Sequence, residues 1–102
     1  MSIFLQATIE IDGAGYQRFV QTMAEWVPII ETSGWKLHAA YMHRTGRLNT
    51  VIDIWELEDM AHMDRGFQHL MAHPRFGEFK RVLDETVKRE TLVVLQKFSY
   101  AS

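Results

Sequence analysis

Asp53 and His38 have the side-chain types and the placement for acid–base chemistry. Asp53 interrupts an apolar run at residues 49–57 and precedes Trp55 by two positions, so both lie on the same side of an extended chain. A carboxylate that holds a histidine fixes its tautomer and makes it a competent general base near neutral pH. We therefore predict that Asp53 and His38 are the catalytic pair of a small-molecule site.

Further side chains are expected to line the same site. Trp55 is suited to stack on a flat ligand. Gln6, Thr8 and Asn49 are suited to orient a carbonyl group or to stabilise an enolate by hydrogen bonds. A mostly apolar wall with a few polar groups is typical of a small-molecule pocket. The predicted ligand-binding residues are Phe4, Gln6, Thr8, Met42, Asn49, Val51 and Trp55.

Two alternatives stay open for this site. Asp53 can instead pair with Lys36, Arg44 or a cation of a second chain, in which case its role is purely structural. The length of the turn before Asp53 also matters, because a one-residue change of register moves every side chain to the other face of the sheet. A three-residue turn would place Tyr41 and His43 on the Asp53 side.

The remaining histidines and motifs give little sign of a metal or cofactor site. His69 and His73 have the i, i+4 spacing that suits a metal on one helix, but Pro74 interrupts that helix and no third ligand lies nearby. His43 and His62 are expected at the surface. The chain has no cysteine, no Gly-rich phosphate loop and no G-x-S-x-G motif. We therefore expect no metal and no cofactor.

Length and composition indicate one domain, residues 1–102, with 47% hydrophobic residues and a net charge of −2. The lysines and arginines are scattered rather than clustered, so nucleic acid is not an expected partner. The N-terminus alternates like a strand and lacks the pattern of a signal peptide, and no segment approaches the roughly 20 apolar residues of a membrane span. We expect a soluble, cytoplasmic protein that does not bind membranes.

The apolar spacing predicts the elements that position these residues. Alternation indicates strands at residues 3–11, 35–44, 49–57 and 92–98. Helical spacing indicates a helix from Tyr16 to about residue 30 and two helical pieces around Pro74, the first with an N-cap at Glu58-Asp59. The order β-α-β-β-α-β predicts an α+β, ferredoxin-like fold, in which helices cover one face of a four-stranded antiparallel sheet.

The faces of the sheet follow from the hairpin between the second and third strands. A two-residue turn near Gly46 pairs even positions of the second strand with odd positions of the third. The residues expected under the helices are then Trp35, Leu37, Ala39, Tyr41, Ile52 and Ile54. Asp53, Trp55 and the other predicted site residues fall on the uncovered face, which is too apolar for water. We therefore expect a second copy of the chain to cover it, forming a homodimer.

One set of residues resembles the NIPSNAP family of the dimeric α/β-barrel superfamily over nearly the whole chain: Gly46, Leu48, Asn49, Val51, Trp55, Glu58, Asp59, Arg65, Pro74 and Phe79. The resemblance implies a homodimer whose two sheets close a barrel, with a cavity in each protomer. Relatives with this fold include cofactor-independent monooxygenases, polyketide cyclases, haem-handling enzymes and proteins of unknown activity.

Two classes of function follow. The first is a cofactor-independent enzyme of the monooxygenase, cyclase or isomerase kind, which uses acid–base or enolate chemistry on an apolar aromatic or polyketide-like substrate. The second is a non-catalytic module that binds a hydrophobic ligand or haem, or a structural dimer. Asp53 separates the classes, because loss of its charge should abolish turnover in the first and leave ligand affinity largely unchanged in the second.

Overall fold

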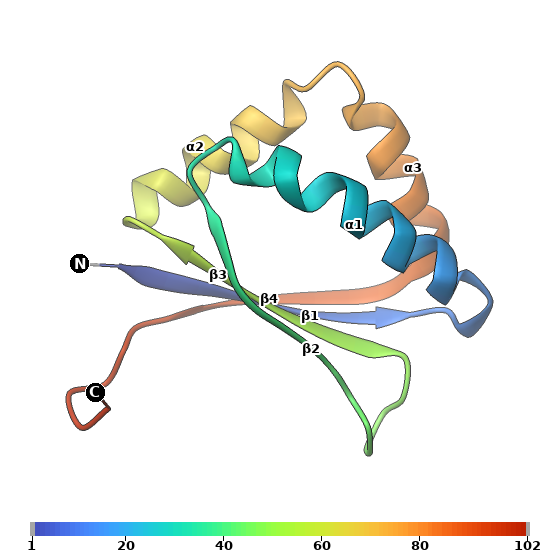
Figure 1. Ribbon diagram of the computed structural model, residues 1–102, viewed down its shortest axis with the longest axis horizontal. Coiled ribbons are helices and arrows are strands. Elements are labelled where there is room, and N and C mark those ends of the chain that lie inside the picture. Colours follow the sequence, from blue (N-terminus) through green and yellow to red (C-terminus); the bar gives the residue numbers. More distant parts are fainter. Residues whose placement is uncertain (1, 102) are drawn as a thin grey trace.

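The computed structural model describes residues 2–101 and has the predicted α+β, ferredoxin-like order (Figure 1). Its elements are β1 (Ile3–Ile11), the short 3-10 helix η1 (Gly13–Gly15), α1 (Tyr16–Glu31), β2 (Lys36–Met42), β3 (Thr50–Leu57), α2 (Met60–Met71), α3 (Phe76–Thr86) and β4 (Val87–Leu95). The expected break in the second helical region lies between α2 and α3, next to Pro74. Asp59 caps α2 as predicted, because its carboxylate accepts a hydrogen bond from the His62 amide at 2.7 Å.

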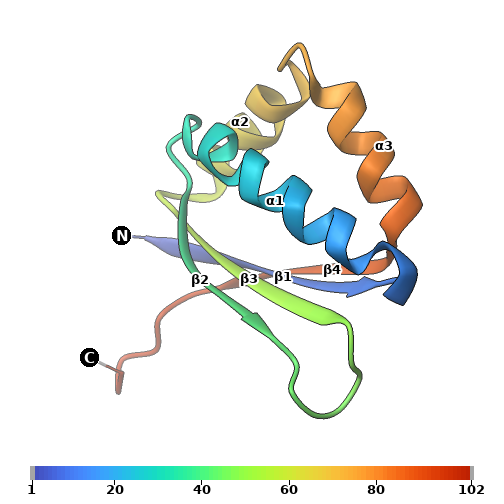
Figure 2. The same cartoon turned by 45° about the vertical axis from the view of Figure 1, so that its right-hand side comes forward.

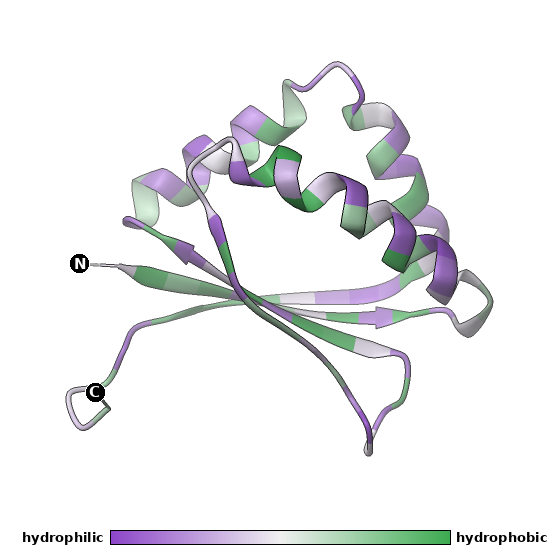
Figure 3. Ribbon diagram, viewed as in Figure 1, coloured by the Kyte–Doolittle hydropathy of each residue, from purple (hydrophilic) through white to green (hydrophobic). Residues whose placement is uncertain are grey.

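The strands form an antiparallel sheet in the order β2-β3-β1-β4. The helices all lie over one face of this sheet, and the other face is bare (Figures 1 and 2). Hydrophobic residues run along the two central strands, β1 and β3 (Figure 3). The buried core between the sheet and the helices includes Leu5, Ile9, Phe19, Trp26, Trp35, Trp55, Leu57 and Phe79.

Two boundaries differ from the sequence prediction. The tight turn expected near Gly46 is wrong, because residues 43–49 form a longer connection in which Gly46 and Asn49 have φ of 80° and 60°. The last strand begins at Val87 and ends at Leu95, rather than running from 92 to 98. Its earlier start has a physical cause: residues 87–95 pair along β1, and this pairing outweighs the charged residues at 88–90.

The predicted face of β3 is also wrong. Ala7 pairs with Asp53 and Leu5 pairs with Trp55, so these β3 side chains lie on the helix-covered face with the buried side chains of β1. Ile52 pairs with Thr8 on the opposite, open face. The sequence left this choice ambiguous, because both parities of β3 are largely apolar and only the long-range pairing with β1 selects one.

The second strand contains an irregularity that the sequence did not reveal. The pairing with β3 shifts between Leu37 and Ala39, so His38 is an extra residue in the strand. As a result, Leu37 and Ala40 both face the helices, whereas Ala39 and Tyr41 lie on the open face, contrary to the prediction for these two residues.

Candidate functional site

A cavity of about 130 Å³ lies between the helices and the sheet. All three longer helices contribute apolar side chains to it, and β1, β3 and β4 form its floor. Two of its residues, Asp53 and Glu90, are acidic, and the rest are apolar or aromatic. This composition is typical of a small-molecule site. The lining residues are Leu5, Ala7, Ile9, Phe19, Met23, Ile30, Trp35, Asp53, Trp55, Phe67, Leu70, Phe79, Leu83, Glu90 and Leu92.

Asp53 is the polar group at the centre of this arrangement. Its side chain is only 5% exposed, and within residues 2–101 it makes no hydrogen bond and no ion pair. Burial raises the pKa of Asp53 from 3.8 to about 6, and the nearby carboxylate of Glu90 adds to this effect. Near neutral pH the carboxyl group is therefore close to the point at which it exchanges its proton, as an acid–base catalyst requires.

Glu90 lies on the same face of the sheet, on the far side of β1. Ala7 pairs with Asp53, and Ile9 pairs with Glu90, so β1 separates the two acidic residues. Desolvation raises the pKa of Glu90. Glu90 is exposed and Leu92 is 45% exposed, which places the opening of the cavity along β4. The sequence prediction missed Glu90 because it began the last strand at residue 92; an earlier strand start would have placed Glu90 on this face.

A second, more open hollow of about 230 Å³ borders Asp53 on the β2 side. Val51 and Leu37 line it from the sheet, and α1 lines it from above. Asp53, Phe19 and Met23 border both spaces. Asp53 thus lies between two apolar spaces, together with these two side chains of α1.

Aromatic residues form one wall of the cavity. The rings of Trp35 and Trp55 are 6.0 Å apart, and the ring of Phe67 meets Trp35 edge-on at 5.0 Å. Trp35 packs directly on Gly66 of α2, where a Cβ atom would come within 2.0 Å of the indole nitrogen. The absence of a side chain at Gly66 therefore allows α2 to lie close enough to hold this wall.

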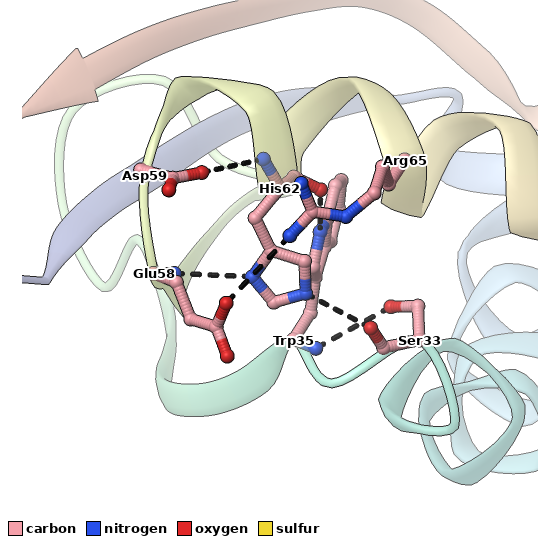
Figure 4. Close-up of polar contacts among 6 residues, drawn as sticks. All are labelled: Ser33, Trp35, Glu58, Asp59, His62 and Arg65. Carbon is pink, nitrogen blue, oxygen red and sulfur yellow. Dashed lines mark hydrogen bonds and ion pairs between the residues drawn. The ribbon is translucent and has the colours of Figure 1, made fainter.

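His62 connects this wall to the neighbouring loops (Figure 4). The prediction of a surface position for it is wrong: it is 4% exposed. The Glu58 amide donates to Nδ1 at 3.0 Å, so the ring carries its proton on Nε2, which donates to the Ser33 carbonyl at 2.9 Å. The Trp35 indole donates to the His62 carbonyl at 3.1 Å. These contacts make His62 a structural link between β3, α2 and the turn after α1.

The predicted catalytic pair does not come together. His38 lies on the open face, where its ring meets Phe4 edge-on at 5.4 Å, whereas Asp53 is under the helices. This geometry corrects the expected contact between the two residues. The cause is the face of β3, which pairing with β1 sets.

The predicted ligand-binding residues divide in the same way. Trp55 and Val51 border the spaces beside Asp53, whereas Gln6 and Thr8 lie with Phe4 on the open face. Their proposed roles in binding stay predictions.

Two further predicted ligand-binding residues lie at the end of the hairpin. Met42 is 61% exposed and accepts a hydrogen bond from the Tyr16 hydroxyl at 3.7 Å. Asn49 belongs to the connection before β3. Both line a shallow hollow there, away from Asp53.

The histidines at the end of α2 have separate partners. His69 forms a hydrogen bond with the Thr32 hydroxyl at 2.8 Å, and His73 Nδ1 accepts from the Arg75 amide at 3.0 Å. Residues 2–101 contain no cluster of three or more residues suited to hold a metal ion. Within the same part of the chain, no helix is long and apolar enough to cross a bilayer.

Comparisons with known proteins identify a family by its sequence model and a shared fold by solved structures. The NIPSNAP family model matches residues 7–102. A NIPSNAP domain protein from Burkholderia xenovorans has a TM-score of 0.82 and 20% identity, covering 100% of this chain and 99% of that chain. A NIPSNAP family protein from Agrobacterium tumefaciens has a TM-score of 0.88 and 17% identity, covering 99% and 97%.

A candidate antibiotic biosynthesis monooxygenase from Bacteroides thetaiotaomicron has a TM-score of 0.74 and 19% identity, covering 95% of this chain and 90% of its own. At these identities the structural matches show a shared fold. None of the curated proteins matches the chain.

Proposed function

This chain belongs to the NIPSNAP family, and we propose that it binds a small apolar molecule beneath its helices and uses Asp53 as an acid–base group on that molecule. The observation that carries the proposal is a carboxyl group, 5% exposed, with no hydrogen-bond or ion-pair partner within residues 2–101 and a cavity beside it. Burial of such a group costs several kcal/mol unless it is paired or protonated, so its presence at a cavity indicates a functional requirement.

The chemistry that fits this site is proton transfer to or from a bound molecule. Burial raises the pKa of Asp53 to about 6, which leaves most of the group ionised and basic at pH 7. Trp55 follows two positions later on the same strand face, and its indole N–H has no hydrogen-bond partner among the described residues. Trp55 therefore supplies a donor near the base, suited to a carbonyl or enolate oxygen.

The size of the cavity restricts the molecule. A dry cavity of about 150 Å³ holds benzene, so a cavity of about 130 Å³ suits a molecule of about one ring. Haem, which has four pyrrole rings, does not fit a cavity of this size, and the lining offers no histidine, cysteine or tyrosine as an iron ligand. The shared fold with a candidate antibiotic biosynthesis monooxygenase supports an activity on a small organic molecule.

The proposal is tested by hydrogen exchange of a carbon acid. A small aromatic ketone is incubated with the protein in D₂O, and deuterium uptake at the carbon beside the carbonyl is followed by NMR. Asp53→Asn should lower the protein-dependent rate by about 10²-fold or more. The matched control is Asp64→Asn, which removes an exposed carboxylate of α2 and should leave the rate unchanged.

Two outcomes separate the classes of function. Exchange that persists in Asp53→Asn contradicts the role of Asp53. Binding of the ketone without exchange in the unmodified protein favours the non-catalytic alternative, in which the same cavity only holds a ligand. That alternative is supported by the placement of His38 on the open face, which leaves Asp53 without the expected second catalytic group.

We also propose that two copies of the chain pair through the open face of the sheet. The helices cover only the opposite face (Figure 2), and Ile52, Ile54 and Val93 lie among charged residues of both signs on the open one. In a two-fold symmetric pair the same patch meets itself, so apolar residues can pack together and charges of opposite sign can face one another. Ile54→Lys should lower the mass of the particle, measured by light scattering, from two chains to one. Gln17→Lys on the exposed side of α1 is the control, and a single-chain mass for the unmodified protein would refute the proposal.

A further inference from the structure

The charges around the cavity are all of one sign. Asp53 and Glu90 are acidic, and neither the cavity nor the adjoining hollow on the β2 side has a lysine, arginine or histidine among its described lining residues. The ion pairs of the described chain lie elsewhere and involve other carboxylates, such as those of Glu85 with Arg18 and Asp84 with Lys80. The cavity therefore has negative charge without a compensating cation.

The basic residues nearest to Glu90 do not supply that cation. Arg89 lies opposite Glu10 in the register of β4 with β1, so it belongs to the open face of the sheet, one position away from Glu90 on the strand. Arg89, Lys80 and Lys88 border an outer hollow together with Glu90, but none of them forms an ion pair with it. Glu90 is therefore available to a ligand at the opening of the cavity.

The aromatic wall, like the two acidic residues, favours a cation as the ligand. The faces of tryptophan and phenylalanine rings attract cations, and this attraction is stronger where water is excluded. Indole N–H groups would favour an anion; that of Trp35 is already donated to the His62 carbonyl, which leaves only that of Trp55 as a donor in this wall, against two carboxylates. The apolar part of a ligand would pack against Phe67 and Phe79.

We propose that the ligand is a small organic cation, a protonated amine on an apolar body of about one ring, with its ammonium group compensated by Asp53 and Glu90. This inference rests on the proposed binding function of the cavity and names the ligand class. An ammonium group near Asp53 favours its ionised form, so the ligand would also place Asp53 in the state that accepts a proton. Carboxylic acids and phosphates of the same size are excluded, because their charge would meet two carboxylates in an apolar site.

The test compares three probes of nearly equal shape: benzylamine, benzyl alcohol and benzoate. Affinities are measured by calorimetry at pH 7.5. Benzylamine should bind at least about tenfold more tightly than benzyl alcohol, and benzoate should not bind detectably. The affinity for benzylamine should fall as the pH is lowered through about 6, because Asp53 then takes up a proton. The groups that face Asp53 from the other elements are apolar except Glu90.

Variants connect the preference to the two acids. Asp53→Asn should bring the affinities for benzylamine and benzyl alcohol to within about threefold of each other. Glu90→Gln should lower the affinity for benzylamine alone, and Asp64→Asn should change neither affinity. All three variants keep the size of the side chain, and thermal unfolding curves show whether they fold.

The possible failures are distinguishable. Equal binding of benzylamine and benzyl alcohol, with both lost in Trp55→Ala, would refute the cation preference and leave the proposed binding function intact. Binding of benzoate as tight as that of benzylamine would also refute the preference. If none of the three probes binds, a ring-sized ligand is excluded, and both this inference and the proposed function fail.

Discussion

Asp53 and His62 are both ionisable and almost completely buried, but their surroundings differ. His62 has hydrogen bonds at both ring nitrogens, and its backbone amide and carbonyl are also used. Asp53 has no hydrogen bond within residues 2–101 and faces open space. A buried polar group with every partner present contributes to folding, whereas one without partners costs free energy of folding and is retained for another reason. The comparison therefore separates a structural residue from a functional one in the same small domain.

The largest effect is expected at His62. His62→Ala removes the partners of the Glu58 amide and the Ser33 carbonyl and leaves a space beneath the turn after α1. We expect a loss of about 4 kcal/mol in the free energy of unfolding, from two broken buried hydrogen bonds and a cavity. Urea denaturation measures it, with His38→Ala on the open face as the control. A loss below about 1 kcal/mol in the free energy of unfolding would show that His62 is not a structural residue.

Gly66→Ala tests the same region through packing. The added methyl group would lie 2.0 Å from the indole nitrogen of Trp35, so α2 or the ring must move. We expect a loss of about 3 kcal/mol. Gly77→Ala on α3 is the matched control, because a Cβ atom there meets no other atom within 4 Å. Equal stability of the two variants would show that Trp35 moves freely, and that the wall of the cavity is not held by α2.

Asp53→Asn should increase the free energy of unfolding, in contrast to the two variants above. The pKa of Asp53 is about 6 in the folded chain and ordinarily 3.8, so the folded state binds more protons between these values and its stability falls as the pH rises through them. The full shift corresponds to about 3 kcal/mol, and Asn keeps a buried polar group, so we expect a gain of roughly 2 kcal/mol at pH 8 and none at pH 3.5. Thermal unfolding at several pH values measures this. A variant less stable at pH 8 would identify Asp53 as structural.

Thr50→Val should give a smaller gain in stability than Asp53→Asn. Thr50 is 2% exposed, and its hydroxyl has no partner in the described chain, as with Asp53, but it does not border the cavity. Valine has the same shape without the unpaired hydroxyl, so we expect a gain of about 1 kcal/mol at every pH. Urea denaturation at several pH values measures this gain. A pH dependence like that of Asp53→Asn would contradict the explanation that the gain comes from removing the unpaired hydroxyl.

The sequence predicted the parts of the fold that depend on local patterns. The alternation of β1, the helical spacing of α1 and the capping of α2 by Asp59 involve neighbouring residues and were correct. The face of β3 was not a local property, because Ile52 and Ile54 compete with Val51 and Trp55 for the core. Pairing with β1 decides that competition, and it also brings β4 into the sheet from Val87 onward.

In the candidate site, too, features set by neighbouring residues were predicted and features set by long-range strand pairing were not. The apolar environment of Asp53 was confirmed, because residue type and neighbours were sufficient, but its predicted position on the uncovered face was wrong, and its catalytic role stays a prediction. Its expected partner His38 and the missed residue Glu90 both depend on how strands far apart in the sequence are aligned. His38 was predicted as the partner because β3 was assigned to the wrong face of the sheet. Glu90 was missed because the last strand was predicted to begin too late.

The bulge at His38 bears on how relatives of this chain are aligned. If His38 were deleted, Leu37, Ala40 and Met42 would still face the helices, and the strand would alternate without interruption. A relative that is one residue shorter at this point can therefore keep the same interior, and the gap in its alignment belongs at position 38 rather than in the loop that follows. On an outer strand, the extra residue also breaks the row of backbone groups that another sheet could join.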